Sequence, residues 1–214
     1  MNVLAPPRTR LPIEVVFDLV CPWCFLGTRR LRTALRARPD IMADILWRPF
    51  LLNPDLPGSE PGRKPGGPDR ARRLHATLTE LGRAEGVPFR FDLIRRVPSS
   101  LDAHRLVRLA SRRGAGDEVV DRIFLAHFTE GADIGDHATL AAIGAAAGLD
   151  RAAVRRFLAG EHETEVVHTE NLRAHRLGIN GVPCFVISGR HAIAGAQEPE
   201  VLQRLLDVAA LEAG

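Results

Sequence analysis

The sequence is poor in several features that mark whole classes of protein. Lys64 is the only lysine among 29 basic residues, and the arginines are spread along the chain instead of gathered in one block. Nucleic-acid binding favours a clustered basic face, so we expect no nucleic-acid partner. No apolar run reaches the length of a membrane span, and residues 1–12 contain no apolar core of signal-peptide length. We therefore expect a cytoplasmic protein without a membrane partner.

Cysteine is scarce as well, with three residues in a chain of 214. Cys21 and Cys24 form a Cys-x-x-Cys pair, and Cys184 stands alone. A structural zinc site needs four ligands, usually supplied by two such clusters, and the second cluster is missing. We therefore expect no metal site. In the cytosol a persistent structural disulfide is rare, so the pair indicates a catalytic dithiol.

The order of the expected elements is βαβ, a block of helices, then ββα. Apolar runs at 13–19 and 45–52 predict strands on either side of a helix at 21–38. Pro49 favours an edge position for the second strand or a bulge near its end. A loop rich in Pro and Gly at 53–69 precedes helical patterns at 70–85, 101–113, 117–129, 137–147, 151–159 and 163–177. Ser100, Asp136 and Asp150 are candidate N-caps. A hairpin at 184–188 and 191–194 and a helix at 199–211 follow, which indicates an α/β protein with a helical insertion.

The Cys-x-x-Cys pair stands where the first strand passes into the first helix. Pro22 suits the first helical position, because its missing N–H has no partner there anyway. Cys21 is thus expected at the helix N-terminus, where unpaired N–H groups and the helix dipole favour a thiolate. Its pKa should then fall into the range of about 3.5–7.5 found for such motifs. Cys24, one turn further on, is shielded and close enough to form a disulfide with Cys21.

A Gly-Val-Pro sequence at 181–183 opens the late hairpin, and it completes a resemblance to a known family. The motifs are Phe17-Asp18-Leu19-Val20-Cys21-Pro22-Trp23-Cys24-Phe25-Leu26-Gly27, Trp47-Arg48-Pro49-Phe50, Leu52-Asn53-Pro54, Ser100-Leu101-Asp102-Ala103-His104-Arg105-Leu106, Glu130-Gly131-Ala132-Asp133-Ile134-Gly135-Asp136, Gly178 to Pro183, and Gly195-Ala196-Gln197. In this order and spacing the sequence resembles the FrnE-like branch of the DsbA-family oxidoreductases. The resemblance covers nearly the whole chain.

The resemblance implies a thioredoxin-like fold interrupted by an all-helical subdomain. We expect a first thioredoxin-like part at 13–55, the insertion with its entry loop at 56–177, and a second thioredoxin-like part at 178–214. In the family, the proline matching Pro183 is cis and packs against the cysteines. The backbone of the preceding residue, here Val182, binds substrate as an added strand. Thiol–disulfide oxidoreductase or isomerase activity is implied, with no metal or organic cofactor.

Several further residues are candidates for the site. Pro22 and Trp23 lie between the cysteines, where they would affect the solvation of Cys21 and hence the redox potential. Asp18 either tunes cysteine ionisation or caps the turn. His104 either faces the cleft, oriented by Asp102, or is a packed or solvated residue of an amphipathic helix.

The chain departs from the branch at Cys184, because an aromatic residue usually follows the motif proline there. Cys184 is either a small buried core residue or a third thiol able to react with Cys21 or a bound substrate. The distance between Cys184 and Cys21 is not set by strand alternation.

Three functions are compatible with these features. The first is exchange of protein or low-molecular-weight disulfides, with Cys21 attacking and Cys24 resolving the mixed disulfide. The second is a glutathione-dependent isomerase or transferase, of the hydroxychromene-carboxylate isomerase or kappa-class type; there a serine generally replaces the attacking cysteine and the resolving cysteine is absent. The third is a redox-regulated, chaperone-like binding module. Glutathione is a candidate partner, and the chain is expected to be a monomer or a homodimer. The substrate, the redox direction and the electron partner stay open.

Overall fold

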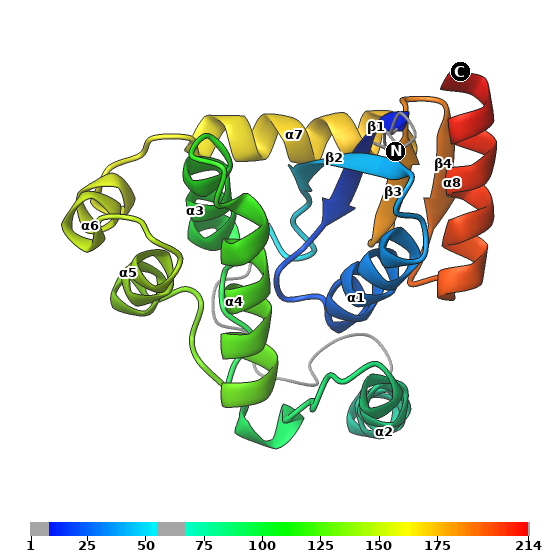
Figure 1. Cartoon of the computed structure of the whole chain (residues 1–214). Coiled ribbons are helices and arrows are strands. Elements are labelled where there is room, and N and C mark those ends of the chain that lie inside the picture. The colour runs from blue at the N-terminus through cyan, green and yellow to red at the C-terminus, as the bar shows by residue number, and fades with distance from the viewer. Residues whose placement is uncertain (1–8, 55–66, 214) are drawn as a thin grey trace, which may run out of the picture.

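The computed structural model describes residues 9–54 and 67–213, and it contains one sheet and two groups of helices (Figure 1). The elements are β1 (Thr9–Phe17), α1 (Pro22–Arg36), β2 (Ile41–Pro49), α2 (Gly67–Ala84), η1 (Phe91–Leu93), α3 (Leu101–Ser111), α4 (Gly116–Glu130), α5 (His137–Ala146), α6 (Arg151–Ala159), α7 (Thr164–Arg176), β3 (Cys184–Ile187), β4 (His191–Ala194) and α8 (Pro199–Ala213). This order is the expected βαβ, helical block and ββα.

The sheet has the order β2-β1-β3-β4 within the described residues. β1 is parallel to β2 and antiparallel to β3, and β3 is antiparallel to β4. β1 therefore lies in the interior of the sheet, and its last residues are buried on both faces. The carboxyl end of β1 delivers the chain directly to the Cys-x-x-Cys pair. The predicted α/β thioredoxin-like fold is confirmed.

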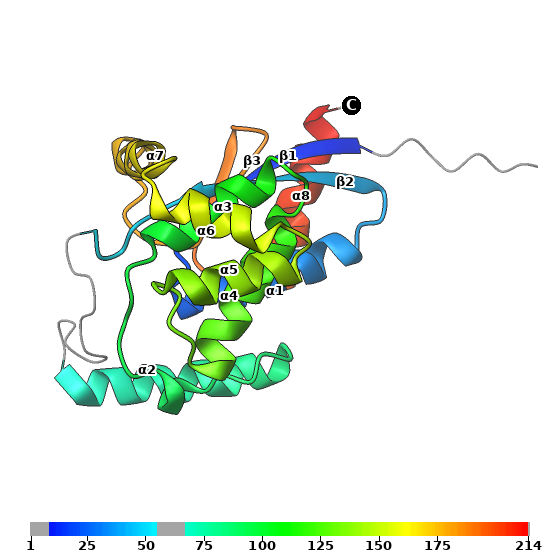
Figure 2. The same cartoon turned by 90° about the vertical axis from the view of Figure 1, so that its left-hand side faces the viewer.

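Both faces of the sheet are covered by helices. On one face, α1 and α8 contact each other and share the main core with β1 and β3. On the other face, α7 contributes Ala174 to a small cluster with Val16, Phe50 and Cys184. Figures 1 and 2 agree in placing α2 at the end of the molecule opposite α7. Since α7 packs on the sheet as well as on α3, the boundary expected at residue 178 stays a prediction.

Aromatic rings join the helical block to the thioredoxin-like part. Phe25 of α1 stacks on Phe124 of α4 with ring centroids 5.1 Å apart, and Phe17 meets the same ring edge-on at 6.2 Å. All three rings are fully buried. Burial of large aromatic side chains is a strong source of stabilisation, so the block is anchored directly beside the strand-to-helix junction.

The first two strands begin and end a few residues earlier in the chain than predicted. β1 begins at Thr9, not at residue 13, and its first four residues pair with 41–44 of β2. Exposed Arg10 and the proline at position 12 concealed this pairing, because they break the apolar run. β2 ends at Pro49, not at residue 52, because Pro49 cannot donate to a ladder. As predicted, this proline lies in an edge strand.

The helices lie within a few residues of their predicted bounds, with one correction at α2. α2 begins at Gly67, inside the expected loop at 53–69; positions 55–66 of that loop lie outside the described residues. The carboxylates of Asp136 and Asp150 accept from the N–H groups of Thr139 and Ala153, as N-caps should. Ser100 occupies the N-cap position of α3, but its side chain makes no capping hydrogen bond. Among the described residues no helix is long and apolar enough to cross a membrane.

Candidate active site

Cys21 lies at the first turn of α1, where the sheet ends. It is the N-cap residue, with extended backbone angles of φ −97° and ψ 111°, and Pro22 follows at the first helical position. The Cys21 carbonyl accepts from the Cys24 N–H at 3.0 Å and from the Phe25 N–H at 3.3 Å. The sulfur therefore stands at the N-terminus of a helix of 15 residues, where the dipole and free N–H groups favour negative charge.

The loop before β3 forms the opposite wall of the site. The Val182–Pro183 peptide bond is cis, as the resemblance implied. The Cys21 thiol donates to the Val182 carbonyl at an Sγ to O distance of 3.7 Å. The Pro183 carbonyl accepts from the Gly195 N–H at 2.7 Å, which ties this loop to the end of β4. Cys21 thus faces the backbone group that was expected to bind substrate.

Cys24 is enclosed behind Cys21. It has no exposed surface, and its Sγ accepts from the Asp18 N–H at 3.5 Å. Burial, together with the hydrogen bond and charge of Cys21, raises the pKa of the Cys24 thiol well above its ordinary value, and the Asp18 N–H opposes this in part. Both thiols are free. The shielded position expected for Cys24 is therefore found.

The two residues between the cysteines contribute differently. Pro22 begins the helix and is partly exposed. Trp23 is partly buried and packs on the main core, so it fixes the first turn of α1 against the body of the protein. Their expected effect on the redox potential stays a prediction.

Asp18 lies in the turn between β1 and α1 and is fully buried. One carboxylate oxygen accepts from the Val20 N–H at 3.3 Å, and the other accepts from the Leu52 N–H at 2.7 Å. Burial alone would raise the pKa of this carboxyl, but the interactions with His104, Leu52 and Ser100 hold it below its ordinary value. Asp18 therefore caps the turn and also places a negative charge near Cys24.

His104 of α3 is also fully buried, and it faces Asp18. Its Nε2 lies 3.6 Å from Asp18 Oδ1, a contact slightly longer than a hydrogen bond. Its ring meets Phe17 edge-on with centroids 5.1 Å apart. The alternative in which Asp102 orients His104 is not found, because that carboxylate binds Arg105 at 2.5 Å and His137 at 2.7 Å.

Cys184 belongs to a different environment. It opens β3 opposite Val16 of β1 and packs in the small cluster on the α7 face. Only 4% of its surface is exposed, and burial raises the pKa of its thiol. These observations favour the interpretation of Cys184 as a core residue. The structure therefore gathers Cys21, Cys24, Asp18, His104 and the Val182–Pro183 loop. Cys184 follows this loop and packs in the small cluster on the α7 face, against which Val182 also packs.

Comparison with known proteins agrees with this geometry. Residues 12–207 match the DSBA-like thioredoxin domain. The chain belongs to the DsbA-like thioredoxin family. A probable DsbA oxidoreductase from Streptomyces coelicolor is 30% identical, with a TM-score of 0.87 over 94% of this chain and 91% of that one. The uncharacterized protein YwbO of Bacillus subtilis is 27% identical over 196 residues, which are 91% of this chain and 94% of YwbO.

More distant DsbA-like and related structures share the fold. The cytosolic disulfide reductase DsbM from Pseudomonas aeruginosa has a TM-score of 0.69 at 21% identity and covers 95% of this chain and 100% of its own. A 2-hydroxychromene-2-carboxylate isomerase has a TM-score of 0.73 at 17% identity, covering 94% of this chain and 97% of its own. At these identities the likeness concerns the fold. Membership of the FrnE-like branch is consistent with these matches and stays a prediction.

Two supporting residues of this DsbA-like site were missed as site residues in the sequence. Gly27 of α1 lies against Pro183, where a side chain would not fit. Arg30, also buried, donates to the Ala196 carbonyl at 2.8 Å and to Glu85 at 2.9 Å, and so links α1 to the segment after β4. A glycine one turn after Cys24 was a detectable signal, whereas an arginine among many arginines was not.

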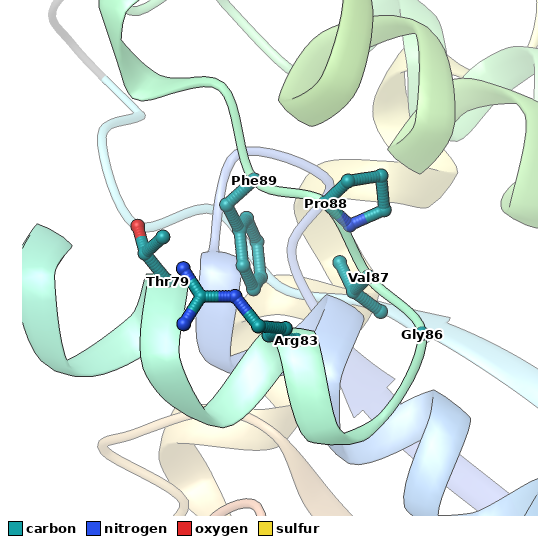
Figure 3. Close-up of a pocket in the computed structure, with 6 residues that line it drawn as sticks. All are labelled: Thr79, Arg83, Gly86, Val87, Pro88 and Phe89. Carbon is teal, nitrogen blue, oxygen red and sulfur yellow. The ribbon is translucent and has the colours of Figure 1, made fainter.

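The structure also has a pocket that is not lined by any of the candidate active-site residues. It has a volume of about 400 Å³ and is lined by Thr79, Arg83, Gly86, Val87, Pro88 and Phe89 (Figure 3). The pocket lies at the end of α2 and the turn after it. Its lining has one charged side chain, Arg83, and one hydroxyl, that of Thr79, which donates to the His75 carbonyl. Across residues 9–54 and 67–213, no three His, Cys, Asp or Glu side chains are grouped as metal ligands would be.

Proposed function

We propose that the protein is a thiol–disulfide oxidoreductase or isomerase that uses Cys21 as the attacking thiol and Cys24 as the resolving thiol. The observation that carries the proposal is the position of Cys21. Its sulfur lies at the start of α1 and 3.7 Å from the Val182 carbonyl. Cys21 is 5% exposed, whereas Cys24, one turn behind it, has no exposed surface. One thiol is thus placed to meet a substrate, and the other is placed to meet only Cys21.

The first step is attack on a substrate disulfide. The Cys21 thiolate, favoured by the helix N-terminus, bonds to one substrate sulfur, and the substrate S–S bond breaks. The second substrate sulfur leaves with the electron pair and takes up a proton. The product is a mixed disulfide between Cys21 and the substrate.

The Val182 carbonyl supplies a binding group for the same step. The thiol of Cys21 donates to this carbonyl, and a thiolate has no proton to donate. Ionisation of Cys21 therefore frees the carbonyl to accept a substrate N–H, as expected for a peptide that adds to the sheet beside β3. Attack and substrate binding are coupled in this way at one pair of atoms.

The second step is release of the substrate. Cys24 loses its proton and attacks the Cys21 sulfur, which forms the Cys21–Cys24 disulfide and expels the substrate thiolate. The pair is oxidised by two electrons and the substrate disulfide is reduced. In the reverse direction a substrate dithiol is oxidised by the same steps, and an isomerase uses the first step without net oxidation.

The substrates that we propose are protein disulfides or low-molecular-weight disulfides, with glutathione as a candidate small thiol. DsbM, with which this chain shares its fold, is described as a cytosolic disulfide reductase, and one of its solved structures is with GSH. We propose by analogy that this chain acts as a thiol–disulfide oxidoreductase in the cytosol. Its direction of electron flow follows from the redox potential, which the contacts of Cys21 do not define.

The isomerase or transferase alternative keeps one supporting observation, which is the shared fold with the hydroxychromene-carboxylate isomerase. The presence of both Cys21 and Cys24 favours exchange instead, because a conjugating or isomerising site needs no resolving thiol. Glutathione binding without turnover of any disulfide would support the alternative. Suppression of aggregation that survives loss of both cysteines would support a binding module.

The test measures reduction of insulin disulfides by the parent protein and three variants. Cys21→Ser is expected to abolish activity. Cys184→Ala is the matched control, because it removes a thiol that the proposed reaction does not use, and it is expected to retain activity. Cys24→Ala is expected to accumulate a mixed disulfide, and mass spectrometry of material trapped in cells then identifies the partner attached to Cys21. Full activity of Cys21→Ser would refute the proposal.

A further inference from the structure

The outer edge of β2 is a long stretch of sheet that faces away from the other strands. β2 lies at the edge of the sheet beside β1 and runs for nine residues, whereas the strand at the opposite edge, β4, has four. Two large apolar side chains of this strand, Met42 and Leu46, are 44% and 42% exposed. A long edge strand with exposed apolar side chains is a template for pairing with another chain.

The backbone of β2 offers hydrogen bonds on this outer side. The N–H of Phe50, directly after β2, donates to the Phe17 carbonyl of β1 at 2.9 Å, so the even-numbered residues here bond to β1. Because the direction of the bonding groups alternates along a strand, the N–H and C=O groups of Ala43 and Ile45 point away from β1. Within the part of the chain that the structure describes, no backbone hydrogen bond engages these groups.

We propose that β2 pairs antiparallel with β2 of a second copy of this chain, about a two-fold axis at Asp44, so that the two sheets become one. In this register Ala43 lies opposite the partner's Ile45, and the two residues exchange both of their backbone hydrogen bonds. The two-fold axis repeats the pair on its other side, because such an interface uses the same surface on both copies. Both residues also pack on the main core of their own copy.

The side chains on the outer face select this register. Met42 comes opposite the partner's Leu46, so each exposed apolar side chain covers another. If the partner moved by two residues in one direction, Met42 would face Asp44, and in the other direction it would face Arg48. Apolar side chains directly opposite each other stabilise a strand pair. The register centred on Asp44 is therefore favoured over its neighbours.

The charge at the two-fold axis is offset within each copy. The two Asp44 carboxylates lie opposite each other there, and like charges in this position destabilise a strand pair. Arg10 of β1 binds Asp44 through two hydrogen bonds, at 2.5 and 2.9 Å. The axis thus brings together two carboxylates and two guanidinium groups, which have no net charge.

Neighbouring elements confine the pairing to the middle of β2. Near the end of the strand, the Trp47 indole donates to Asp117 of α4 at 2.7 Å, so the helical block lies beside that end. At the start of the strand, the Ile41 N–H donates to the Arg38 carbonyl at 3.0 Å. The stretch 42–46 remains between these two ends, and it is the stretch that the proposed register uses.

The pairing leaves the thiol site of each copy open. Val182 and Pro183 precede β3, which lies on the side of β1 opposite β2. A substrate that binds beside this loop does not compete with the second copy. The inference therefore concerns a surface that the proposed reaction does not use, and either proposal can fail without the other.

Sedimentation equilibrium tests the dimer, with the protein kept reduced and measured over a range of micromolar concentrations. For the parent protein we expect twice the chain mass of 23.4 kDa. Leu46→Arg places a charge opposite the partner's Met42 at both ends of the pair and should give the chain mass. Met42→Arg should do the same, because the two side chains face each other. Leu211→Arg is the matched control, since it changes a leucine of α8 that is 84% exposed, and it should leave the dimer intact.

Introduced cysteines test the register, in a background where all three native cysteines are replaced by serine. Asp44→Cys should form a disulfide with its own copy under mild oxidation. Facing residues of a non-hydrogen-bonded pair have Cα atoms about 4.5 Å apart, which a disulfide can span. Met42→Cys alone should stay reduced, because the two copies of position 42 are displaced by about 13 Å along the strands. A mixture of Met42→Cys and Leu46→Cys should form the mixed disulfide.

Three results would overturn the inference. The first is a parent protein with the chain mass at every concentration measured. The second is a dimer that Leu46→Arg and Met42→Arg leave intact, which would place the interface elsewhere. The third is a dimer in which Asp44→Cys does not crosslink, which would refute the register. Circular dichroism shows whether the arginine variants fold; if one does not, the other variant and the Asp44→Cys crosslink decide the question.

Discussion

Gly27, one turn after Cys24 on α1, lies in contact with the ring of Pro183. A Cβ added at Gly27 would come within 2.8 Å of Pro183 Cγ and 3.3 Å of Phe185 Cζ. Real Cβ atoms essentially never come as close as 2.8 Å to another heavy atom, so the absence of a side chain at this position is what allows α1 to reach the proline loop. The helix that carries the cysteines can therefore pack closely against the loop that carries Val182 because position 27 has no Cβ.

We expect Gly27→Ala to lower both stability and disulfide turnover. The proline ring and the Phe185 ring belong to a packed core, and overpacking such a site typically costs about 1–3 kcal/mol. The shift of the loop should also change the 3.7 Å contact between Cys21 and Val182. Urea unfolding and insulin reduction measure the two effects. Gly181→Ala, where an added Cβ would meet open space, is the control for stability, and a Gly27→Ala protein as stable as the parent would contradict the argument.

The fold was predictable because its strongest signals are local. The apolar run of β1, Pro22 at the first helical position and the return of strand patterns after Pro183 together indicate the thioredoxin-like order. The ends of the elements were less predictable. Thr9 to Pro12 look polar and irregular, yet they form strand because β2 offers them a complete set of partners. Such pairing is a long-range property that no local pattern contains.

The site was predictable in part for the same reason. Cys21 and Cys24 were proposed from a contiguous motif, whereas Asp102, considered as a partner of His104, binds Arg105 and His137 instead. Helical spacing shows which residues of α3 share a face, but it does not show which element that face meets. The contact with Asp18 spans 86 positions and depends on how the helical block docks beside β1. The choice of Ser100 as a capping residue failed likewise, because its interaction with Asp18 is tertiary.

Cys184 is expected to be the slowest of the three thiols to react. It is buried in the cluster on the α7 face, and burial raises the pKa of its thiol, so little thiolate is present at neutral pH. Alkylation of the reduced protein with iodoacetamide at neutral pH should therefore label Cys21 first and leave Cys184 unlabelled until denaturant is added. Peptide mass spectrometry over time measures this order. Labelling of Cys184 as fast as Cys21 in the folded protein would restore it as a third reactive thiol.

His127 should make the protein less stable as the solution becomes acidic. Burial lowers the pKa of this histidine, only partly opposed by the Ala132 carbonyl and the charges of Asp133 and Asp18. In the unfolded chain the pKa returns to about 6.5. At pH values between the pKa of the folded state and 6.5, the unfolded state binds more protons at this residue. The free energy of unfolding therefore decreases as the pH is lowered, by up to about 1.4 kcal/mol per pH unit.

We therefore expect His127→Asn, which can keep a donor towards the Ala132 carbonyl, to flatten the dependence of stability on pH below about 6.5. The variant loses packing and is expected to be less stable at neutral pH, so the slope and not the absolute value is the test. Urea unfolding at several pH values, with the cysteines kept reduced, supplies the slope. His162→Asn removes an exposed imidazole, and because burial is the cause of the effect, this control should keep the parent's slope. Equal slopes for the parent and His127→Asn would show that the buried histidine does not limit stability in acid.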